Sequence, residues 1–216
     1  MAIRDISNKS ESIRIGIGGP VGCGKTRLIE RLLPLFQEKE LKVAVVTNDL
    51  VTFEDAERIR ASGLLDPGLV EGVETGGCPH TAIREDPSIN INAVEKLEKT
   101  YNPDVVLIES GGDNLAATFS ADLVDYWIFM IDTAAGDDIP RKRGLGAINS
   151  NLLVINKIDL APYVGANLEQ MKRDVEVVRD GRPSLFISLA DQSGGKMVFD
   201  YLYNHILLPL KKVNVE

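Results

Sequence analysis

The chain has 216 residues, of which 44% are apolar and 26% are charged, a balance typical of globular proteins that bury a core. Its formal net charge of -8 disfavours binding to nucleic acid phosphates or to anionic membrane surfaces. Residues 1–12 are mixed polar and charged, and no stretch approaches about 18 consecutive apolar residues. We therefore expect a cytoplasmic protein that binds neither nucleic acid nor membrane.

Short β-branched runs alternate with amphipathic stretches, which predicts βα units that build a largely parallel sheet. The strands expected are residues 13–17, 42–47, 105–109, 127–132, 152–156 and 185–188. The helices expected are one that follows Lys25, then residues 54–61, 92–101, 168–178 and 197–206. The prediction is an α/β fold with three layers, in which residues 1–12 form a polar tail and residues 13–216 form a single domain.

Residues 63–90 differ from the rest because they are rich in Gly, Pro, Asp and Thr and lack sustained periodicity. Long irregular segments in compact domains are usually functional or mobile, so we expect a functional loop here. A plain surface connection is the alternative.

A glycine-rich loop follows the first predicted strand. Residues 19–26 read GPVGCGKT, which matches the phosphate-binding motif G-x-x-x-x-G-K-[ST] in its strand-loop-helix context. Backbone N–H groups of such a loop bind phosphate, the lysine ammonium reaches the β- and γ-phosphates, and the threonine hydroxyl binds Mg²⁺. Cys23 is interpreted as a small filler rather than a reactive thiol. The residues expected to contact the nucleotide here are Gly19, Gly22, Cys23, Gly24, Lys25 and Thr26.

Carboxylates at the ends of two strands are candidates to complete the phosphate site. Asp49 follows the second predicted strand and Glu109 ends the third, and ligands of open α/β sheets collect beyond these strand ends. The run ESGG at 109–112 resembles a modified Walker B motif with Gly112 available to meet the γ-phosphate. Which carboxylate positions the attacking water stays open, and plain turn residues are the alternative.

A base-selecting motif closes the strand at 152–156. Asn156, Lys157 and Asp159 belong to NKID, which matches the N-K-x-D motif of GTPases. The Asp159 carboxylate can accept two N–H groups of guanine, whereas adenine would leave it unpaired. Residues 188–191 occupy the position that usually closes over guanine, although their match is poor. We therefore expect GTP and GDP as ligands rather than ATP.

Cys78 and His80 flank a proline within the segment 63–90. The proline favours an extended backbone, which lets a thiolate and an imidazole two residues apart converge on a metal. Two ligands fall short of the four of a stable site, so a two-fold dimer is the simplest completion. The geometry leaves nickel and zinc open, and a Cys and a His packed in a loop remain the alternative. His205 lacks such spacing and is expected to be a packed or surface residue.

Taken together, these motifs resemble the urease accessory GTPases of the UreG family over nearly the whole chain. The resemblance implies a GTPase of the dimerising P-loop class, a nickel metallochaperone that delivers Ni²⁺ to apo-urease. We expect slow turnover in the isolated chain, because no internal arginine finger or catalytic glutamine is evident. GTP and nickel would drive the homodimer, and other urease accessory proteins would be partners. The runs that carry it are GPVGCGKT at 19–26, TND at 47–49, VETGGCPHTAIRED at 73–86, ESGGDNL at 109–115, IPRK at 139–142, NKID at 156–159 and LAPYVGA at 160–166.

The resemblance also implies roles for individual residues. Cys78 and His80 would bind Ni²⁺, Lys25, Thr26, Asp49 and Glu74 would serve phosphate and Mg²⁺, and Asn156 and Asp159 would read guanine. The residues expected to serve catalysis, from their places in the phosphate loop and at the strand ends, are Lys25, Asp49 and Glu109. The chain departs from the family pattern at residues 51–53, which read VTF, and at residues 188–191. The alternatives are a metabolic P-loop kinase or synthetase, and a GTPase that loads nickel or zinc into another metalloenzyme such as hydrogenase.

Overall fold

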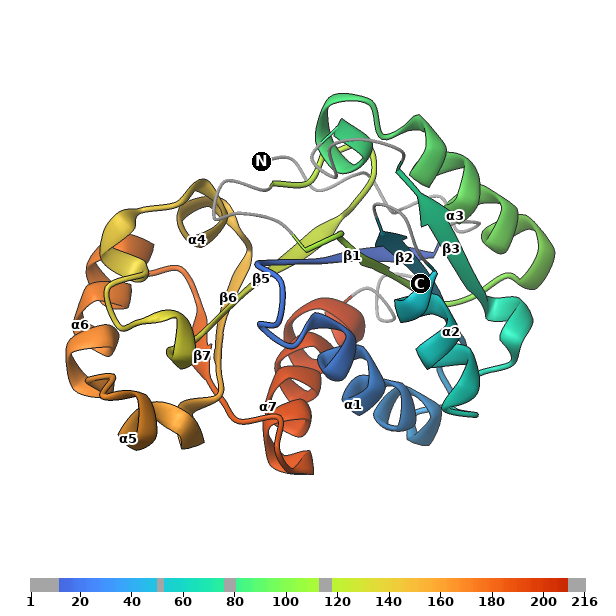
Figure 1. Ribbon diagram of the computed structural model, residues 1–216. Coiled ribbons are helices and arrows are strands. Elements are labelled where there is room, and N and C mark those ends of the chain that lie inside the picture. Colours follow the sequence, from blue (N-terminus) through green and yellow to red (C-terminus); the bar gives the residue numbers. More distant parts are fainter. Residues whose placement is uncertain (1–11, 50–52, 76–80, 113–117, 210–216) are drawn as a thin grey trace.

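A computed structural model describes residues 12–49, 53–75, 81–112 and 118–209. Within this part of the chain the strands form one parallel sheet of seven, in the order β3-β2-β4-β1-β5-β6-β7 (Figure 1). The strands are β1 (Ile13–Gly18), β2 (Val43–Asp49), β3 (Val70–Glu74), β4 (Val105–Glu109), β5 (Tyr126–Asp132), β6 (Leu152–Asn156) and β7 (Ser184–Phe186). The α/β fold with a parallel sheet is therefore confirmed.

Helices cover both faces of this sheet, as the sequence predicted. Among the described residues, no helix is long and apolar enough to cross a membrane. A π-helical turn, Thr81–Glu85, precedes the third helix. The helices are α1 (Lys25–Glu38), α2 (Glu54–Ala61), α3 (Ser88–Tyr101), α4 (Leu145–Asn149), α5 (Ala161–Val164), α6 (Leu168–Arg179) and α7 (Gln192–Leu202).

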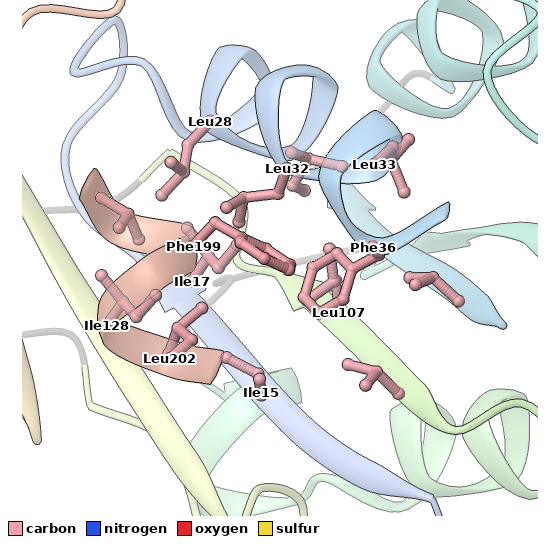
Figure 2. Packing of buried hydrophobic residues seen from close by; sticks show 14 of the residues in the cluster. Ile15, Ile17, Leu28, Leu32, Leu33, Phe36, Leu107, Ile128, Phe199 and Leu202 are labelled. Carbon is pink, nitrogen blue, oxygen red and sulfur yellow. The ribbon is translucent and has the colours of Figure 1, made fainter. Parts of the chain in front are cut away.

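Two apolar clusters lie on opposite faces of the sheet because successive strand residues point to opposite sides. Helices α1, α2 and α7 cover one face, where Ile15 and Ile17 of β1 are fully buried. Figure 2 shows these strand side chains beneath Phe36 of α1 and Phe199 of α7. Helices α3, α4 and α6 cover the other face, which contains the alternate residues of β2, β4, β5 and β6. The central strands are therefore buried on both sides, which explains their continuous apolar runs.

The structure corrects the prediction of irregular chain over residues 63–90. Val70–Glu74 form the edge strand β3, and α3 begins at Ser88 rather than at residue 92. Glu71 and Gly72 interrupt the apolar run of β3, and the strand is only partly buried because it has one neighbour. An edge strand therefore lacks the continuous apolar signal by which the central strands were found.

The last predicted elements also begin earlier than expected. Strand β7 is Ser184–Phe186, and α7 starts at Gln192, where the Asp191 side chain accepts a hydrogen bond from Ser193 N at 2.8 Å. A π-helical turn, Tyr203–Leu207, follows α7 in the region where the sequence predicted continuous helix. The backbone N–H of Ile187 donates to the Ile155 carbonyl oxygen at 2.8 Å, so the loop at residues 187–191 lies beside the end of β6.

Candidate nucleotide site

The predicted site residues gather at the carboxyl edge of the central strands. Strand β1 lies between β4 and β5 in the sheet. The chain runs from β1 to β2, toward one edge of the sheet, and from β4 to β5, toward the other edge. Such a switch point is where open α/β sheets bind ligands. The loops after β1, β4, β5 and β6 therefore all lie at the carboxyl edge of the sheet.

The loop after β1 owes its shape to three glycines. Gly19, Gly22 and Gly24 adopt φ of 145°, 77° and 104°, a region that side chains with a Cβ rarely occupy. A Cβ on Gly19 would lie 2.3 Å from the Met130 carbonyl oxygen, and one on Gly24 would lie 2.5 Å from Asn156 Nδ2. The glycine spacing of the motif thus allows the loop to pass close to β5 and β6.

Lys25 lies within the curl of this loop at the start of α1. Its side chain is buried, and its ammonium donates to the carbonyl oxygens of Gly19 at 3.1 Å and Pro20 at 3.2 Å. These bonds hold a positive charge where the loop backbone turns. A positive charge beside the first turn of a helix is suited to binding a phosphate group.

Thr26 brings together two carboxylates from different elements. Its Oγ1 lies 2.7 Å from Glu109 Oε1 at the end of β4 and 2.9 Å from Asp55 Oδ1 in the first turn of α2. A hydroxyl carries one proton and can satisfy only one of two ionised acceptors. The three oxygen groups therefore form a cluster that favours either a shared proton or a bound cation.

The environment of Glu109 supports this interpretation. Burial raises the pKa of its carboxyl to about 7, and the charge of Asp55 adds to the rise, while the Thr26 hydrogen bond and Lys25 oppose it. Glu109 Oε2 is buried and has no hydrogen-bond partner among the described residues. Oxygen donors of this kind are the ligands that Mg²⁺ prefers, so the cluster fits a magnesium ion.

Asp55 was not predicted from the sequence, because it lies in a helix and not at the end of a strand. Glu54, Asp55 and Glu57 all lie in the first turn of α2, and the sequence does not show which of them faces the loop after β1. The predicted ligands Asp49 and Glu74 end neighbouring strands and are paired in the β2–β3 register, with the Glu74 side chain exposed. Their roles toward magnesium stay predictions. Among the described residues no three Asp, Glu, His or Cys side chains form a metal cluster.

Asn156 links the base-selecting motif to the phosphate loop. Its Nδ2 donates to the Cys23 carbonyl oxygen at 2.9 Å, and its Oδ1 accepts from Leu189 N at 3.1 Å. The Asp159 carboxylate is exposed, and its Oδ1 accepts from Ser188 Oγ at 2.5 Å. Despite its poor match, the segment 188–191 therefore lies beside the N-K-x-D motif, as the sequence predicted.

Lys157 has a backbone conformation that fixes the turn of this motif. Its φ is 59°, its ammonium forms an ion pair with Asp132 at 3.1 Å, and its carbonyl oxygen accepts from Thr133 Oγ1 at 2.5 Å. The ion pair holds the aliphatic part of the Lys157 side chain near Asp132 at the end of β5. Its contact with a guanine ring stays a prediction.

The predicted nickel ligands Cys78 and His80 lie outside the described residues. Cys23 is a buried free thiol, and burial raises its pKa to about 11, which agrees with its interpretation as a filler. His205 is exposed and stacks on Tyr201 with ring centroids 4.4 Å apart.

Comparisons with known proteins agree with this geometry. The family model described as CobW/HypB/UreG, nucleotide-binding domain, matches residues 13–186. A urease accessory protein UreG of Mycolicibacterium gilvum is 63% identical over 185 residues, which cover 85% of this chain and 90% of the relative. The crystal structure of the hydrogenase maturation factor HypB from Archaeoglobus fulgidus is similar with a TM-score of 0.71 and 28% identity, and 91% of each chain is covered.

A second solved structure shares the fold. HypB from Helicobacter pylori in complex with nickel matches with a TM-score of 0.75 and 22% identity, covering 91% of this chain and 87% of that one. The order of the strands, the glycine-rich loop and these similarities all point to one class of nucleotide-binding proteins.

Proposed function

This chain belongs to the CobW/HypB/UreG family of nucleotide-binding proteins, and from that membership we propose that it is a GTP-hydrolysing nickel metallochaperone that delivers Ni²⁺ to apo-urease. The observation that carries the proposal is the 63% identity over 185 residues with a protein named urease accessory protein UreG. The lower identity of 28% with HypB of A. fulgidus makes hydrogenase the less favoured recipient.

The proposed nucleotide is GTP, bound from its phosphates to its base along the edge of the sheet. Backbone N–H groups of the loop at 19–24 and the Lys25 ammonium would bind the phosphates, while Asn156, Lys157 and Asp159 would bind guanine. The exposed Asp159 carboxylate beside Ser188 supports the guanine assignment, because two oxygens can accept the two N–H groups on one edge of that base.

The proposed magnesium ligands surround the Thr26 hydroxyl. Thr26, Asp49 and Glu74 were predicted from the sequence, and the contacts of Thr26 with Asp55 and Glu109 add two carboxylates to the candidates. When bound, magnesium would neutralise the charge that develops on the phosphate oxygens. We propose that Lys25 stabilises the same charge and that Glu109 or Asp49 orients the attacking water.

The proposed cargo is one Ni²⁺ held between two copies of the chain. Cys78 and His80 of each copy would complete a four-ligand site, so that GTP and nickel together favour the homodimer. Hydrolysis would then release the metal toward apo-urease, with other urease accessory proteins as partners. We further propose that turnover is slow in the isolated chain, because the sequence shows no evident internal arginine finger or catalytic glutamine.

Size-exclusion chromatography with light scattering and metal analysis tests this proposal. With Ni²⁺ and a non-hydrolysable GTP analogue, we expect a dimer that carries about one nickel per pair, and a monomer with GDP alone. Cys78→Ala should lose the bound nickel while keeping GDP affinity, because Cys78 lies outside the phosphate loop.

An exposed side chain on α6 provides the control for this substitution. Val177→Ala changes a residue outside the nucleotide site and the proposed metal site, and should keep the nickel-loaded dimer. A wild-type chain that binds GTP but remains a metal-free monomer would contradict the shared nickel site. Activation of apo-urease by the loaded dimer, with zinc as competitor, tests the recipient and the metal.

A further inference from the structure

Two buried asparagines lie between the nucleotide site and the turn that follows Cys78 and His80. Asn48 Nδ2 in β2 donates to the Glu109 carbonyl oxygen at 2.9 Å. Asn90 Nδ2 in α3 donates to Asn48 Oδ1 at 2.7 Å and to the Ala82 carbonyl oxygen at 2.8 Å. A continuous hydrogen-bonded path therefore runs from the end of β4 through β2 and α3 to the turn Thr81–Glu85.

The directions of these hydrogen bonds are fixed by their partners. The Glu109 carbonyl can only accept, so Asn48 must present its amide nitrogen there and its oxygen to Asn90. Asn90 must in turn use both amide protons, one on Asn48 and one on Ala82. A flipped Asn90 amide would bring its oxygen against two acceptors, so the path has one arrangement.

The position of Asn90 is costly for packing alone. The side chain is fully buried, and its Oδ1 has no hydrogen-bond partner among the described residues. A buried acceptor without a partner destabilises a fold. An apolar side chain at this position would remove that acceptor but would leave Asn48 Oδ1 and the Ala82 carbonyl oxygen without their donor. The Asn90 amide therefore links β2 to the turn Thr81–Glu85, which is a positioning role.

The path joins the nucleotide site to both flanks of the segment that carries Cys78 and His80. On the N-terminal flank, Val73 and Glu74 pair with Asn48 and Asp49 in the β2–β3 register. On the C-terminal flank, Ala82 is held by Asn90, and the next residue, Ile83, is fully buried. A displacement at the ends of β2 and β4 would therefore reach both flanks of the segment. The route to the C-terminal flank depends on a single side chain, Asn90.

We propose that Asn90 is a positioning residue that couples occupancy of the nucleotide site to the segment bearing Cys78 and His80. The inference rests on the proposed function, because it assigns a route by which GTP and nickel influence one another. A shift of the ends of β4 and β2 on nucleotide binding would move the Asn48 amide, and Asn90 would transmit that movement to the Ala82 carbonyl. By linkage, nickel on this segment stabilises the GTP-bound state to the same extent.

Measurement of nickel affinity with and without a non-hydrolysable GTP analogue tests the coupling. Competition with a chromogenic chelator gives the nickel affinity in each nucleotide state, and the readout is the ratio of the two affinities. A variant that weakens nickel binding equally in both states leaves this ratio unchanged. In the wild type we expect a ratio of about 5 to 150, the usual range for coupled sites. Asn90→Leu keeps the number and branching of the side-chain heavy atoms but removes the donors, and should bring the ratio close to one.

Val94→Ala is the matched control, because Val94 is fully buried in the same helix one turn further on. It loosens α3 without touching the hydrogen-bonded path and should keep the wild-type ratio. Asn90→Ala is the second variant should Asn90→Leu fail to fold. An Asn90 variant that folds and keeps the wild-type ratio overturns the inference.

The reactivity of the Cys78 thiol toward an aromatic disulfide reagent provides a readout that needs no nickel. Cys23 is buried, and burial raises the pKa of its thiol to about 11, so it reacts slowly at pH 8. We expect the GTP analogue to change the Cys78 rate several-fold relative to GDP in the wild type and in Val94→Ala, but not in Asn90→Leu. A nucleotide-dependent rate in a chain that binds no nickel refutes the proposed function alone. Equal rates in all nucleotide states of the wild type refute the coupling itself.

Discussion

At the scale of single residues, Glu109 makes the stability of the nucleotide-free chain depend on pH. Its pKa rises from 4.5 to about 7 on folding, so between these values the folded chain keeps a proton that the unfolded chain releases. Stability must then fall as pH rises through this window, by about 3 kcal/mol at most. We expect Glu109→Gln to lack this fall when the free energy of unfolding is measured in urea at pH 5 and pH 8 with EDTA.

Glu169→Gln is the control for this prediction, because Glu169 is an exposed carboxylate on α6 whose ion pair with Lys172 lies on the surface. That variant should keep the wild-type difference between pH 5 and pH 8. Parallel pH profiles for the wild type and Glu109→Gln would mean that the Glu109 carboxyl ionises normally in the folded chain.

At the scale of elements, Arg31 attaches helix α1 to the loop that follows β7. Its guanidinium donates to the carbonyl oxygens of Leu189 at 3.3 Å and Ala190 at 3.0 Å. The helix that begins in the phosphate loop therefore also holds the segment beside Asp159. We expect Arg31→Ala to weaken GDP binding about fivefold in calorimetry, which corresponds to about 1 kcal/mol for a partly exposed hydrogen bond.

Arg27→Ala provides the comparison on the same helix. Arg27 is exposed, and its ion pair with Glu30 at 3.0 Å stays within α1, so this variant should bind GDP as the wild type does. Equal GDP affinity in the Arg31 and Arg27 variants would show that the loop after β7 keeps its position without Arg31.

At the scale of the whole molecule, elements from the two ends of the chain stabilise one core. Phe36 of α1 contacts Phe199 of α7 edge to face, with ring centroids 5.1 Å apart (Figure 2). Phe36 is fully buried, so Phe36→Ala should lower the free energy of unfolding by about 3 to 5 kcal/mol. Calorimetry should show a Tm lower by about 6 to 20 °C. The exposed Val177 on α6 provides the control, since Val177→Ala should leave Tm nearly unchanged.

The sequence predicted those elements whose signal is local. Strands β4 and β6 were predicted with their observed bounds, because both are buried on two faces and read as continuous apolar runs. Strand β3 was missed because an edge strand with Glu71 and Gly72 has no such run. The start of α7 was missed because the prediction relied on the spacing of apolar residues, which begins after the first turn of the helix. The capping residue Asp191 gives a weaker signal in the sequence.

The candidate site was predictable only where its residues belong to contiguous motifs. The loop at 19–26 and the run at 156–159 could be recognised from the sequence, because each function depends on a fixed spacing of neighbouring residues. Three other residues contact the site through partners that are distant in the sequence, with separations between 29 and 159 residues. They are Asp55, Arg31 and Asn90. Such contacts depend on how α1, α2 and α3 pack on the sheet, and hydrophobic periodicity does not reveal the partner of a polar side chain.

The hydrogen bonds of Asn156 have a consequence for how a nucleotide is bound. This side chain joins the Cys23 carbonyl of the phosphate loop to the backbone of Leu189, so two hydrogen bonds of one residue connect both ends of the proposed ligand site. A free base and a free diphosphate would each lose their translational freedom on binding, whereas a nucleotide loses it once. The ribose then acts as a short tether that gives the second group a high effective concentration once the first is bound.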